Sequence, residues 1–291
     1  MSEQLSVAPG AVEAFRRDGY YVHRQLMEPA TAEDACAWLR ARNPADLAKS
    51  WTEQEPGVPL AVFSVAHIGD HPIARIATAP SLGEVASTLL GAPVYMWASK
   101  VNLKAAWCGT VEYFHQDLVY WKDRGYRRHD LMTGMVFLQS HTDRNGALHV
   151  MPGTHRLGFI EHEPFVNING LSKYMVPPST LTRLHRDHGI VAIEGEPGDA
   201  VFFHGGVVHG SSHNISPESR MVVISQFNVV GNEPVDVASS ARQFNLRRAE
   251  FEVAEAERRH NWFKRKYEEQ RASNDVTFAA PIPGHERQPS G

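Results

Sequence analysis

Short apolar segments separated by turn residues fill the middle of the chain and constrain its fold more than any other feature. They begin with VYMWASKVNL at Val94 and end with RMVVISQFNVV, which starts at Arg220. Gly, Pro, Asn and Asp stand between them, and this punctuation favours an antiparallel sandwich or barrel over βαβ units. The intervening runs are VEYFHQDLVYW, TGMVFLQS, LHVMPG, GIVAIEGEPGD and AVFFHGG.

Helical patterns flank this region. Residues 11–17 are typical of a short helix, and the YYVHRQLM that follows is typical of a strand. Residues 31–42 place Ala32, Ala35, Cys36 and Leu39 at helical spacing, and SLGE at 81–84 is a capping-box pattern for a helix that Gly91 closes. We therefore predict a mainly β fold with flanking helices on a jelly-roll core, which is a double-stranded β-helix.

The chain of 291 residues fits one large domain or two modest ones, and it contains no internal repeat or low-complexity linker. We predict a single domain over residues 1–291. It comprises a helical and strand N-terminal part at 1–93, a jelly-roll core at 94–232, a charged C-terminal helix at 243–271 and a loose tail at 272–291.

The composition excludes several classes of function. A net charge of −4 gives no electrostatic footprint for nucleic acid. No apolar run approaches the roughly 20 residues that a membrane span needs, and MSEQLSVAPG lacks the regions of a signal peptide. Two cysteines support neither a disulfide framework nor a cysteine zinc site. We expect a cytoplasmic protein that binds a small molecule.

His115 and Asp117 stand two positions apart in one of the apolar runs. If the run is a strand, both side chains project to the same face, because strand residues alternate. A buried imidazole and carboxylate need a metal or a hydrogen-bond network to offset desolvation. A His-x-Asp pair also arises by chance, so it stays open whether these two bind metal or form the polar margin of a strand.

Further candidate ligands lie in GDAVFFHGGVVHGSSHNISPESR, residues 198–220. It contains His204, His209 and His213, and it ends with Arg220. Two histidines and one carboxylate on one face of an octahedron are diagnostic of non-haem Fe(II) oxygenases, and the open positions admit a chelating 2-oxo acid and oxygen. Arg220 can pair with the far carboxylate of such an acid, although a surface ion pair is the commoner fate of an arginine.

The combination of these motifs resembles the phytanoyl-CoA dioxygenase superfamily of Fe(II)/2-oxoglutarate oxygenases. It consists of His115-x-Asp117, His-Gly-Ser at 209–211 and Arg220 eleven positions after His209. The resemblance spans about residues 15–230 and includes RNGALHVMPGTHR at 144–156. Within the superfamily the chain looks closest to bacterial hydroxylases of amino acids and of ectoine. The shared residues are Asn102 and Lys104 in KVNLK, and Trp121.

The resemblance implies a role for each matching residue. His115, Asp117 and His209 would bind Fe(II). Arg220 would bind the distal carboxylate of 2-oxoglutarate, with Ser211, Thr133 and Asn102 as further polar contacts. His204 is the competing ligand, but the arginine would then follow sixteen positions later, which departs from the family spacing. Because Asp117 is kept, halogenation is not expected. The implied reaction couples decarboxylation of 2-oxoglutarate to succinate with hydroxylation by O2.

The substrate side is less constrained. Arg128, or in second place Arg127, is predicted to pair with an anionic substrate group, and a solvated loop is the alternative. The segment 161–189 is either a lid or a passive loop. Further residues considered for substrate contact are Trp121, His149 and His204.

A free amino acid or amino-acid-like metabolite is favoured over an acyl-CoA thioester, which would ordinarily need a broader basic surface. Three rival interpretations remain. The chain could be a non-catalytic jelly-roll binding protein, or a zinc hydrolase, which leaves Arg220 without a role. It could also keep the iron chemistry with desaturation, epimerisation or ring closure as the outcome.

Overall fold

The computed structural model describes residues 7–42, 50–51, 62–64, 66–67, 69–109, 111–122, 126, 129–166 and 172–232. The helices are α1 (Ala11–Asp18), α2 (Pro29–Arg40), α3 (Pro72–Ala77), α4 (Pro80–Leu90), α5 (Leu118–Lys122) and α6 (Pro178–His188), with short 3-10 turns η2 (Asp143–Asn145) and η3 (Thr154–Leu157). The strands are β1 (Tyr20–His23), β2 (Ser50–Trp51), β3 (Val62–Ser64), β4 (Val94–Lys104), β5 (Glu112–His115), β6 (Leu131–Phe137), β7 (Leu148–Met151), β8 (Glu163–Val166), β9 (Ser172–Met175), β10 (Val191–Ile193), β11 (Ala200–His204), β12 (Val208–Ser211) and β13 (Arg220–Val229).

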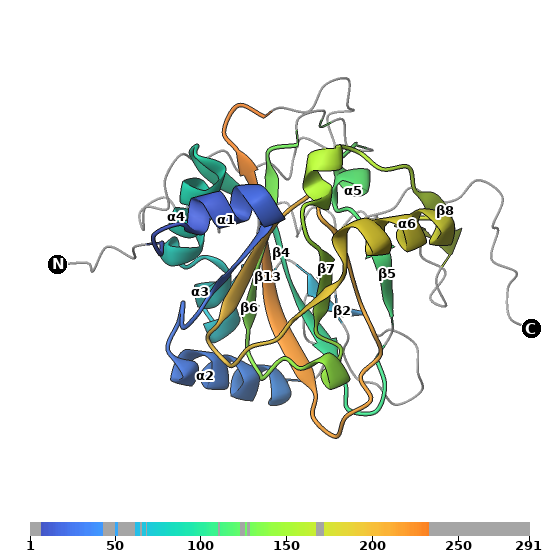
Figure 1. Cartoon of the computed structure of the whole chain (residues 1–291). Helices are drawn as coiled ribbons and strands as arrows, with labels where there is room; N and C mark the ends of the chain where they lie inside the picture. Colours follow the sequence, from blue (N-terminus) through green and yellow to red (C-terminus); the bar gives the residue numbers. More distant parts are fainter. Residues whose placement is uncertain are drawn as a thin grey trace, which may run out of the picture.

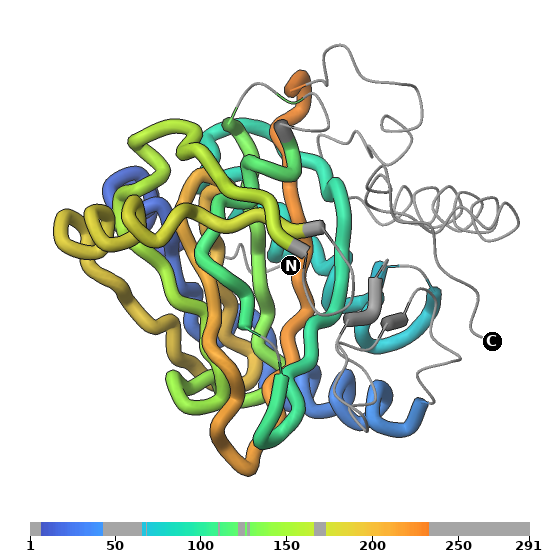
Figure 2. Tube along the Cα trace, turned by 90° about the vertical axis from the view of Figure 1, so that its right-hand side faces the viewer, coloured from blue at the N-terminus to red at the C-terminus, as the bar shows by residue number. Residues whose placement is uncertain are grey.

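Two antiparallel sheets build the core. The major sheet has the order β1-β11-β6-β13-β4-β3-β2, and the minor sheet has the order β10-β7-β12-β5. Figure 2 shows β13, in orange, beside β4, with which it pairs along its whole length. A separate hairpin joins β8 and β9. The non-consecutive strand order is that of a jelly roll, and the prediction of a mainly β jelly roll is confirmed.

Alternation along the strands sorts side chains between two layers. Phe203, Met135 and Val222 of the major sheet pack against Leu148 and Val150 of the minor sheet, so they line the space between the sheets. Their strand neighbours point the other way, onto helices α1 to α4, which cover the outer face of the major sheet (Figure 1). The interior face is therefore free to carry the polar residues of a site.

The N-terminal part contributes both helices and strands. Helix α1 ends at Gly19, whose φ of 80° lets its backbone N–H donate to the Phe15 carbonyl, and β1 then pairs with β11. Helix α2 buries the same four residues that the sequence pattern predicted, namely Ala32, Ala35, Cys36 and Leu39. Helix α4 does end at Gly91, but the predicted capping box is wrong, because Pro80 opens this helix without a side-chain cap.

Three details of the core differ from the sequence prediction. The run VEYFHQDLVYW is not one strand, because β5 ends at His115 and helix α5 starts at Leu118. The short strand β12 was not recognised, because it has only four residues, of which Gly210 and Ser211 are typical of a turn. The segment 161–189 contains the β8–β9 hairpin and helix α6. The helix predicted at 243–271 lies outside the described residues.

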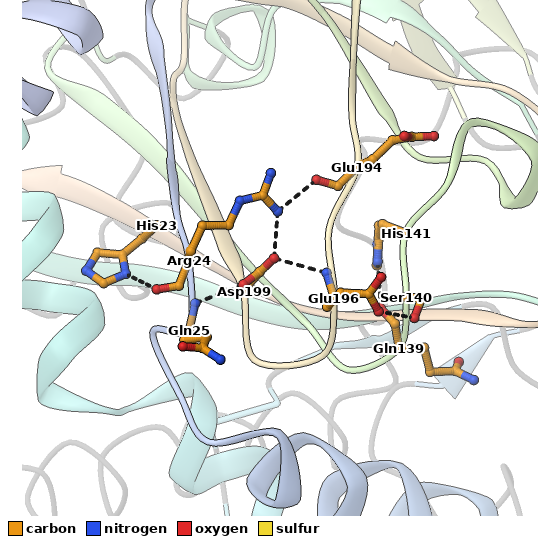
Figure 3. Close-up of polar contacts among 9 residues, drawn as sticks. All are labelled: His23, Arg24, Gln25, Gln139, Ser140, His141, Glu194, Glu196 and Asp199. Atoms are coloured by element: carbon orange, nitrogen blue, oxygen red, sulfur yellow. Dashed lines mark hydrogen bonds and ion pairs between the residues drawn. The ribbon is translucent and has the colours of Figure 1, made fainter. Parts of the chain in front are cut away.

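A buried carboxylate fastens the end of β1 to the turn before β11 (Figure 3). Asp199 accepts hydrogen bonds from Arg24 Nη1 at 2.6 Å, from the Gln25 backbone N–H at 2.8 Å and from the Glu196 backbone N–H at 3.0 Å. Burial alone would raise the pKa of Asp199, but these donors hold it below its ordinary value. The outermost strand of the major sheet is thereby fixed to its neighbour.

Candidate active site

Three potential metal ligands meet between the sheets. His115 ends β5 and lies directly opposite His209 of β12, and Asp117 follows in the turn before α5. The ligand atoms of the three side chains lie within 4.8 Å of one another. Among the described residues, this is the one group of His, Cys, Asp or Glu side chains that could hold a metal ion. Asp117 Oδ1 is 3.7 Å from the Nε2 atom of each histidine. The two histidines and the carboxylate thus face one point, although Asp117 reaches it from a turn and not from a strand.

Backbone carbonyls fix the orientation of both imidazoles. His115 Nδ1 donates to the carbonyl oxygen of Tyr113 at 2.7 Å, and His209 Nδ1 donates to that of Val207 at 2.9 Å. Because a carbonyl only accepts, each ring carries its proton on Nδ1. The lone pair of each Nε2 is therefore directed at the other ligands, which is the tautomer that a metal requires.

The charges of the three side chains also suit a metal. Burial alone would raise the pKa of Asp117, but His115, His209 and the hydroxyl of Thr133 lower it well below its ordinary value. Thr133 Oγ1 donates to Asp117 Oδ2 at 2.7 Å. Burial and the neighbouring His115 lower the pKa of His209 to about 4. At neutral pH the group therefore holds an ionised carboxylate and a neutral His209 imidazole, as Fe(II) binding requires.

The residue between the first two ligands points away from them and holds the turn in place. Gln116 is fully buried; its Nε2 donates to the carbonyls of Gly158 and Gly206 at 2.9 and 2.7 Å, and its Oε1 accepts from the Ile160 backbone N–H at 2.8 Å. Its own backbone N–H donates to His162 Nε2 at 2.9 Å. The role of Gln116 could not be predicted from the sequence, since a glutamine in the middle of His-x-Asp gives no signal of burial.

A positively charged end of the interior lies beyond His209. Ser211 shares the interior face with His209 and is buried. Arg220 begins β13 opposite Lys104 of β4, and its exposed fraction is 3%. Lys104 Nζ donates to the Ser212 carbonyl at 2.5 Å, which places this cationic end next to the end of β12. A buried arginine and lysine form a strongly attractive site for a carboxylate.

Asn102 belongs to the same interior face, because it pairs with Val222. Its Oδ1 atom is buried and has no hydrogen-bond partner among the described residues. Native proteins rarely leave such an atom unsatisfied, so it indicates a polar group that binds there. The predicted 2-oxoglutarate contact at Asn102 stays a prediction that this geometry supports.

Aromatic side chains form the walls near the three ligands. Phe203 lies with its ring centroid 4.7 Å from that of His209, and Tyr120 lies 5.8 Å from His115. Trp121 packs in a buried cluster with Trp97 and Tyr126, its ring centroid 4.4 Å from that of Trp97. Phe203 and Tyr120 thus border the two histidines with aromatic surface.

Two of the candidate substrate residues do not join the ligand group. His204 follows Phe203 on β11 and so points to the opposite face, where its ring contacts Phe15 and His155. Burial lowers the pKa of His204 to about 3, and its Nδ1 accepts from the Gly206 backbone N–H. His149 lies on the outer side of β7, with Nε2 2.8 Å from Asp143 Oδ1. Residues 127 and 128 lie outside the described part of the chain.

Two polar residues of the interior face were missed from the sequence. Gln226 follows Arg220 by six positions on the interior face of β13 and pairs with Thr133. Counting every second residue from Arg220 would have found it. Glu112 pairs with Ser211, and its side chain forms an ion pair with Lys173 of β9. No sequence signal places Glu112 inside, because regular alternation from His115 puts it on the outer face.

A jelly roll that carries two histidines and one carboxylate around a point, with a buried arginine further along, defines a class of protein. This is the class of non-haem Fe(II) oxygenases that use a 2-oxo acid. Among the described residues, no helix is both long and apolar enough to cross a membrane.

Comparison with known proteins agrees with this class. The family model described as phytanoyl-CoA dioxygenase (PhyH) matches residues 15–222. The chain is 34% identical to L-proline trans-4-hydroxylase of Streptomyces griseoviridis over 62% of its own length and 75% of that protein. It is 32% identical to ectoine dioxygenase of Sphingopyxis alaskensis over 84% of both.

Solved structures agree as well. The crystal structure of EctD from S. alaskensis with 2-oxoglutarate and 5-hydroxyectoine superimposes with a TM-score of 0.68 at 28% identity, covering 86% of this chain and 87% of that one. The same protein with bound Fe gives a TM-score of 0.68 at 28% identity, covering 85% and 84%. The chain belongs to the phytanoyl-CoA dioxygenase family and is an Fe(II)- and 2-oxoglutarate-dependent dioxygenase.

Proposed function

We propose that this dioxygenase hydroxylates an unactivated C–H bond of a free amino acid or a compound like one. The observation that carries the proposal is the convergence of His115, Asp117 and His209 in a jelly roll whose relatives include a proline hydroxylase and an ectoine dioxygenase. Both names refer to small substrates that contain nitrogen and a carboxylate. The predicted cytoplasmic location and the small-molecule substrate belong to this proposal.

In this proposal His115 Nε2, His209 Nε2 and one oxygen of Asp117 bind the iron. The donor set fits Fe(II), since both rings present a lone pair and the carboxylate is ionised. When bound, Fe(II) would activate O2, the oxidant for C–H hydroxylation, with 2-oxoglutarate as the two-electron donor that is decarboxylated to succinate. The protein's own contribution is to orient the ligands, bind the co-substrate and keep water away.

Arg220 binds the distal carboxylate of 2-oxoglutarate in this scheme, and Ser211 and Asn102 supply further polar contacts. Support comes from the burial of Arg220, the adjacent Lys104 and the unsatisfied Asn102 Oδ1. Thr133 was also predicted to contact 2-oxoglutarate, and its hydroxyl donates to Asp117. We therefore propose that Thr133 acts first by holding the metal carboxylate.

Trp121 and its aromatic neighbours would form the wall against which the substrate packs. The predicted role of Arg128 as the partner of a substrate anion stays a prediction. Neither His204 nor His149 is needed, because each makes hydrogen bonds away from the ligand group.

Anaerobic titration with Fe(II) and 2-oxoglutarate tests the iron site. We expect a weak visible metal-to-ligand charge-transfer band in the wild type and in His204→Ala, and no band in His209→Ala. A band that survives in His209→Ala, or that is absent from His204→Ala alone, would contradict the ligand assignment. His204→Ala is the matched control, because it removes an imidazole from β11 whose ring contacts Phe15 and His155, away from the ligand group.

The substrate class is tested by aerobic turnover with a panel of free amino acids, ectoine and acyl-CoA thioesters. We expect succinate formation and a gain of one oxygen atom in a member of the first two groups. Measuring both products matters, because succinate alone also arises from turnover uncoupled from substrate oxidation. Oxygen gain in an acyl-CoA thioester only would overturn the proposal.

A further inference from the structure

The start of β5 places an additional carboxylate in the wall of the active site. The pairing of β5 with β12 contains an irregularity: His115 lies opposite His209, but Ser211 lies opposite Glu112. Three steps along β5 thus match two steps along β12. A bulge of this kind re-aims a side chain, and such bulges occur often beside active sites.

The bulge decides the direction of Glu112. In a regular strand, Glu112 and His115 would point to opposite faces. Because Glu112 instead pairs with Ser211, it shares the interior face with His209 and His115. Gly210 lies opposite the bulge, where an added Cβ would come within 2.7 Å of the Glu112 carbonyl oxygen. The glycine between His209 and Ser211 therefore lets the bulge form.

Glu112 is ionised and has a cationic partner from outside the barrel. Burial alone would raise its pKa, but the Lys173 ammonium, followed by His115 and Lys100, lowers it to about 2. Lys173 Nζ donates to Glu112 Oε1 at 2.5 Å from strand β9 of the separate hairpin. Glu112 also acts electrostatically on His209, so its charge is felt at the iron ligands.

This carboxylate is not used by the iron site. Glu112 is absent from the group of potential metal ligands found among the described residues. Tethering the hairpin does not need a carboxylate, because Tyr113 of β5 already contacts Phe165 of β8. A carboxylate that points inward loses part of its hydration, and this unfavourable free energy is offset only if a cation stays beside it. The side chains of Glu112 and Lys173 remain 30% and 20% exposed, so a ligand can reach the pair.

We propose that Glu112 recognises the positively charged nitrogen of the substrate and that Lys173 is the counter-ion that occupies this place before the substrate binds. The inference rests on the proposed function and specifies it: the substrate is a cation or a zwitterion. When the nitrogen takes the place of Lys173, the carboxylate keeps a cationic partner. An anionic group at the same position would be repelled by Glu112.

The first test compares wild type with Glu112→Gln on a cationic substrate that the panel identifies, with 2-oxoglutarate saturating. We expect kcat/KM to fall about 10- to 150-fold, the range that corresponds to losing one charge-assisted hydrogen bond. The affinity for 2-oxoglutarate, read from the charge-transfer band, should not change. The band also shows that the variant is folded and binds iron.

The charge-swapped double variant, Glu112→Lys with Lys173→Glu, separates recognition from tethering. It keeps an ion pair between β5 and β9 but reverses the charge in the wall. We expect kcat/KM to stay low, whereas restoration to the wild-type value would overturn the inference in favour of a tether. Lys173→Met keeps the carboxylate and removes the competing cation, so KM should fall, and a rise in KM would favour the tether.

A comparison on the wild type alone needs no variant to fold. L-proline and cyclopentanecarboxylate have the same ring shape, and only L-proline carries a positive nitrogen. Both compounds are tested as competitors of the identified substrate. Inhibition by L-proline but not by cyclopentanecarboxylate supports the inference, and equal inhibition by the two compounds overturns it. A wild type that oxidises no amino-acid-like compound contradicts the proposed function itself. If the wild type and Glu112→Gln oxidise the same amino-acid-like compound equally well, the inference alone is contradicted.

Discussion

Replacing Thr133 with valine tests how the metal carboxylate is held. Thr133 Oγ1 donates to Asp117 Oδ2 at 2.7 Å, and the threonine is buried. Valine has nearly the same shape, so the change removes the donor and leaves the packing of β6 largely intact. The carboxylate would keep its contacts with the two imidazoles but lose the bond that fixes the position of its second oxygen.

The expected size of the effect follows from that one bond. A hydrogen bond to a charged acceptor contributes about 1.5–3 kcal/mol. Loss of a group that orients a metal ligand lowers metal affinity roughly 10- to 100-fold, which corresponds to about 1.4–2.7 kcal/mol. The two ranges agree. We therefore expect the Kd for Fe(II) of Thr133→Val to rise about 10- to 100-fold.

Anaerobic calorimetric titration of the metal-free protein with Fe(II) measures this Kd directly. A second titration, of 2-oxoglutarate into iron-saturated protein, should give nearly the wild-type affinity. Thr133→Ser is the matched control, because it keeps the hydroxyl, and its Fe(II) affinity should stay close to that of wild type. Unchanged Fe(II) affinity with weakened 2-oxoglutarate binding in Thr133→Val would refute the reasoning and assign the hydroxyl to the co-substrate.

Two further predictions concern stability. Gln116→Met removes three side-chain hydrogen bonds of a fully buried amide. At about 1 kcal/mol for each bond, the free energy of unfolding of the metal-free protein, measured with denaturant, should fall by about 3 kcal/mol. A fall of less than about 1 kcal/mol would contradict the role of the amide. Because the pKa of Glu112 is lowered to about 2 from 4.5, its stabilising effect is complete above pH 4.5 and is lost as the pH falls towards 2. The difference in unfolding free energy between wild type and Glu112→Gln should therefore narrow by about 1 kcal/mol per pH unit below pH 4.5, and a constant difference would contradict it.

The ligand group could be predicted from sequence because its signal depends on residue type and spacing. His115, Asp117 and His209 are uncommon types at family spacings, and the structure brings their ligand atoms together. The prediction that His115 and Asp117 face the same way because both lie on one strand is nevertheless wrong. The strand ends at His115, and a turn held by Gln116 brings the carboxylate round.

Other features were out of reach because they depend on contacts between distant segments. The burial of Gln116 requires carbonyls from Gly158 and Gly206, which the sequence cannot place beside it. The inward direction of Glu112 depends on a bulge that shifts the register by one residue, and nothing in EYFH marks it. In contrast, alternation on β11 could have placed His204 on the face opposite Phe203.

Two carboxylates on one short stretch of chain illustrate how surroundings assign a role. Asp117 faces two imidazoles that present lone pairs, and a hydroxyl occupies its other oxygen, so the open position between them suits a metal cation. Glu112 faces an ammonium group that belongs to a separate hairpin, so the cation beside it can be exchanged. Since burial would raise the pKa of both, each stays ionised only through its neighbours. The same short stretch of chain would thus supply a fixed charge for the iron at Asp117 and a replaceable charge for the substrate at Glu112, five positions earlier.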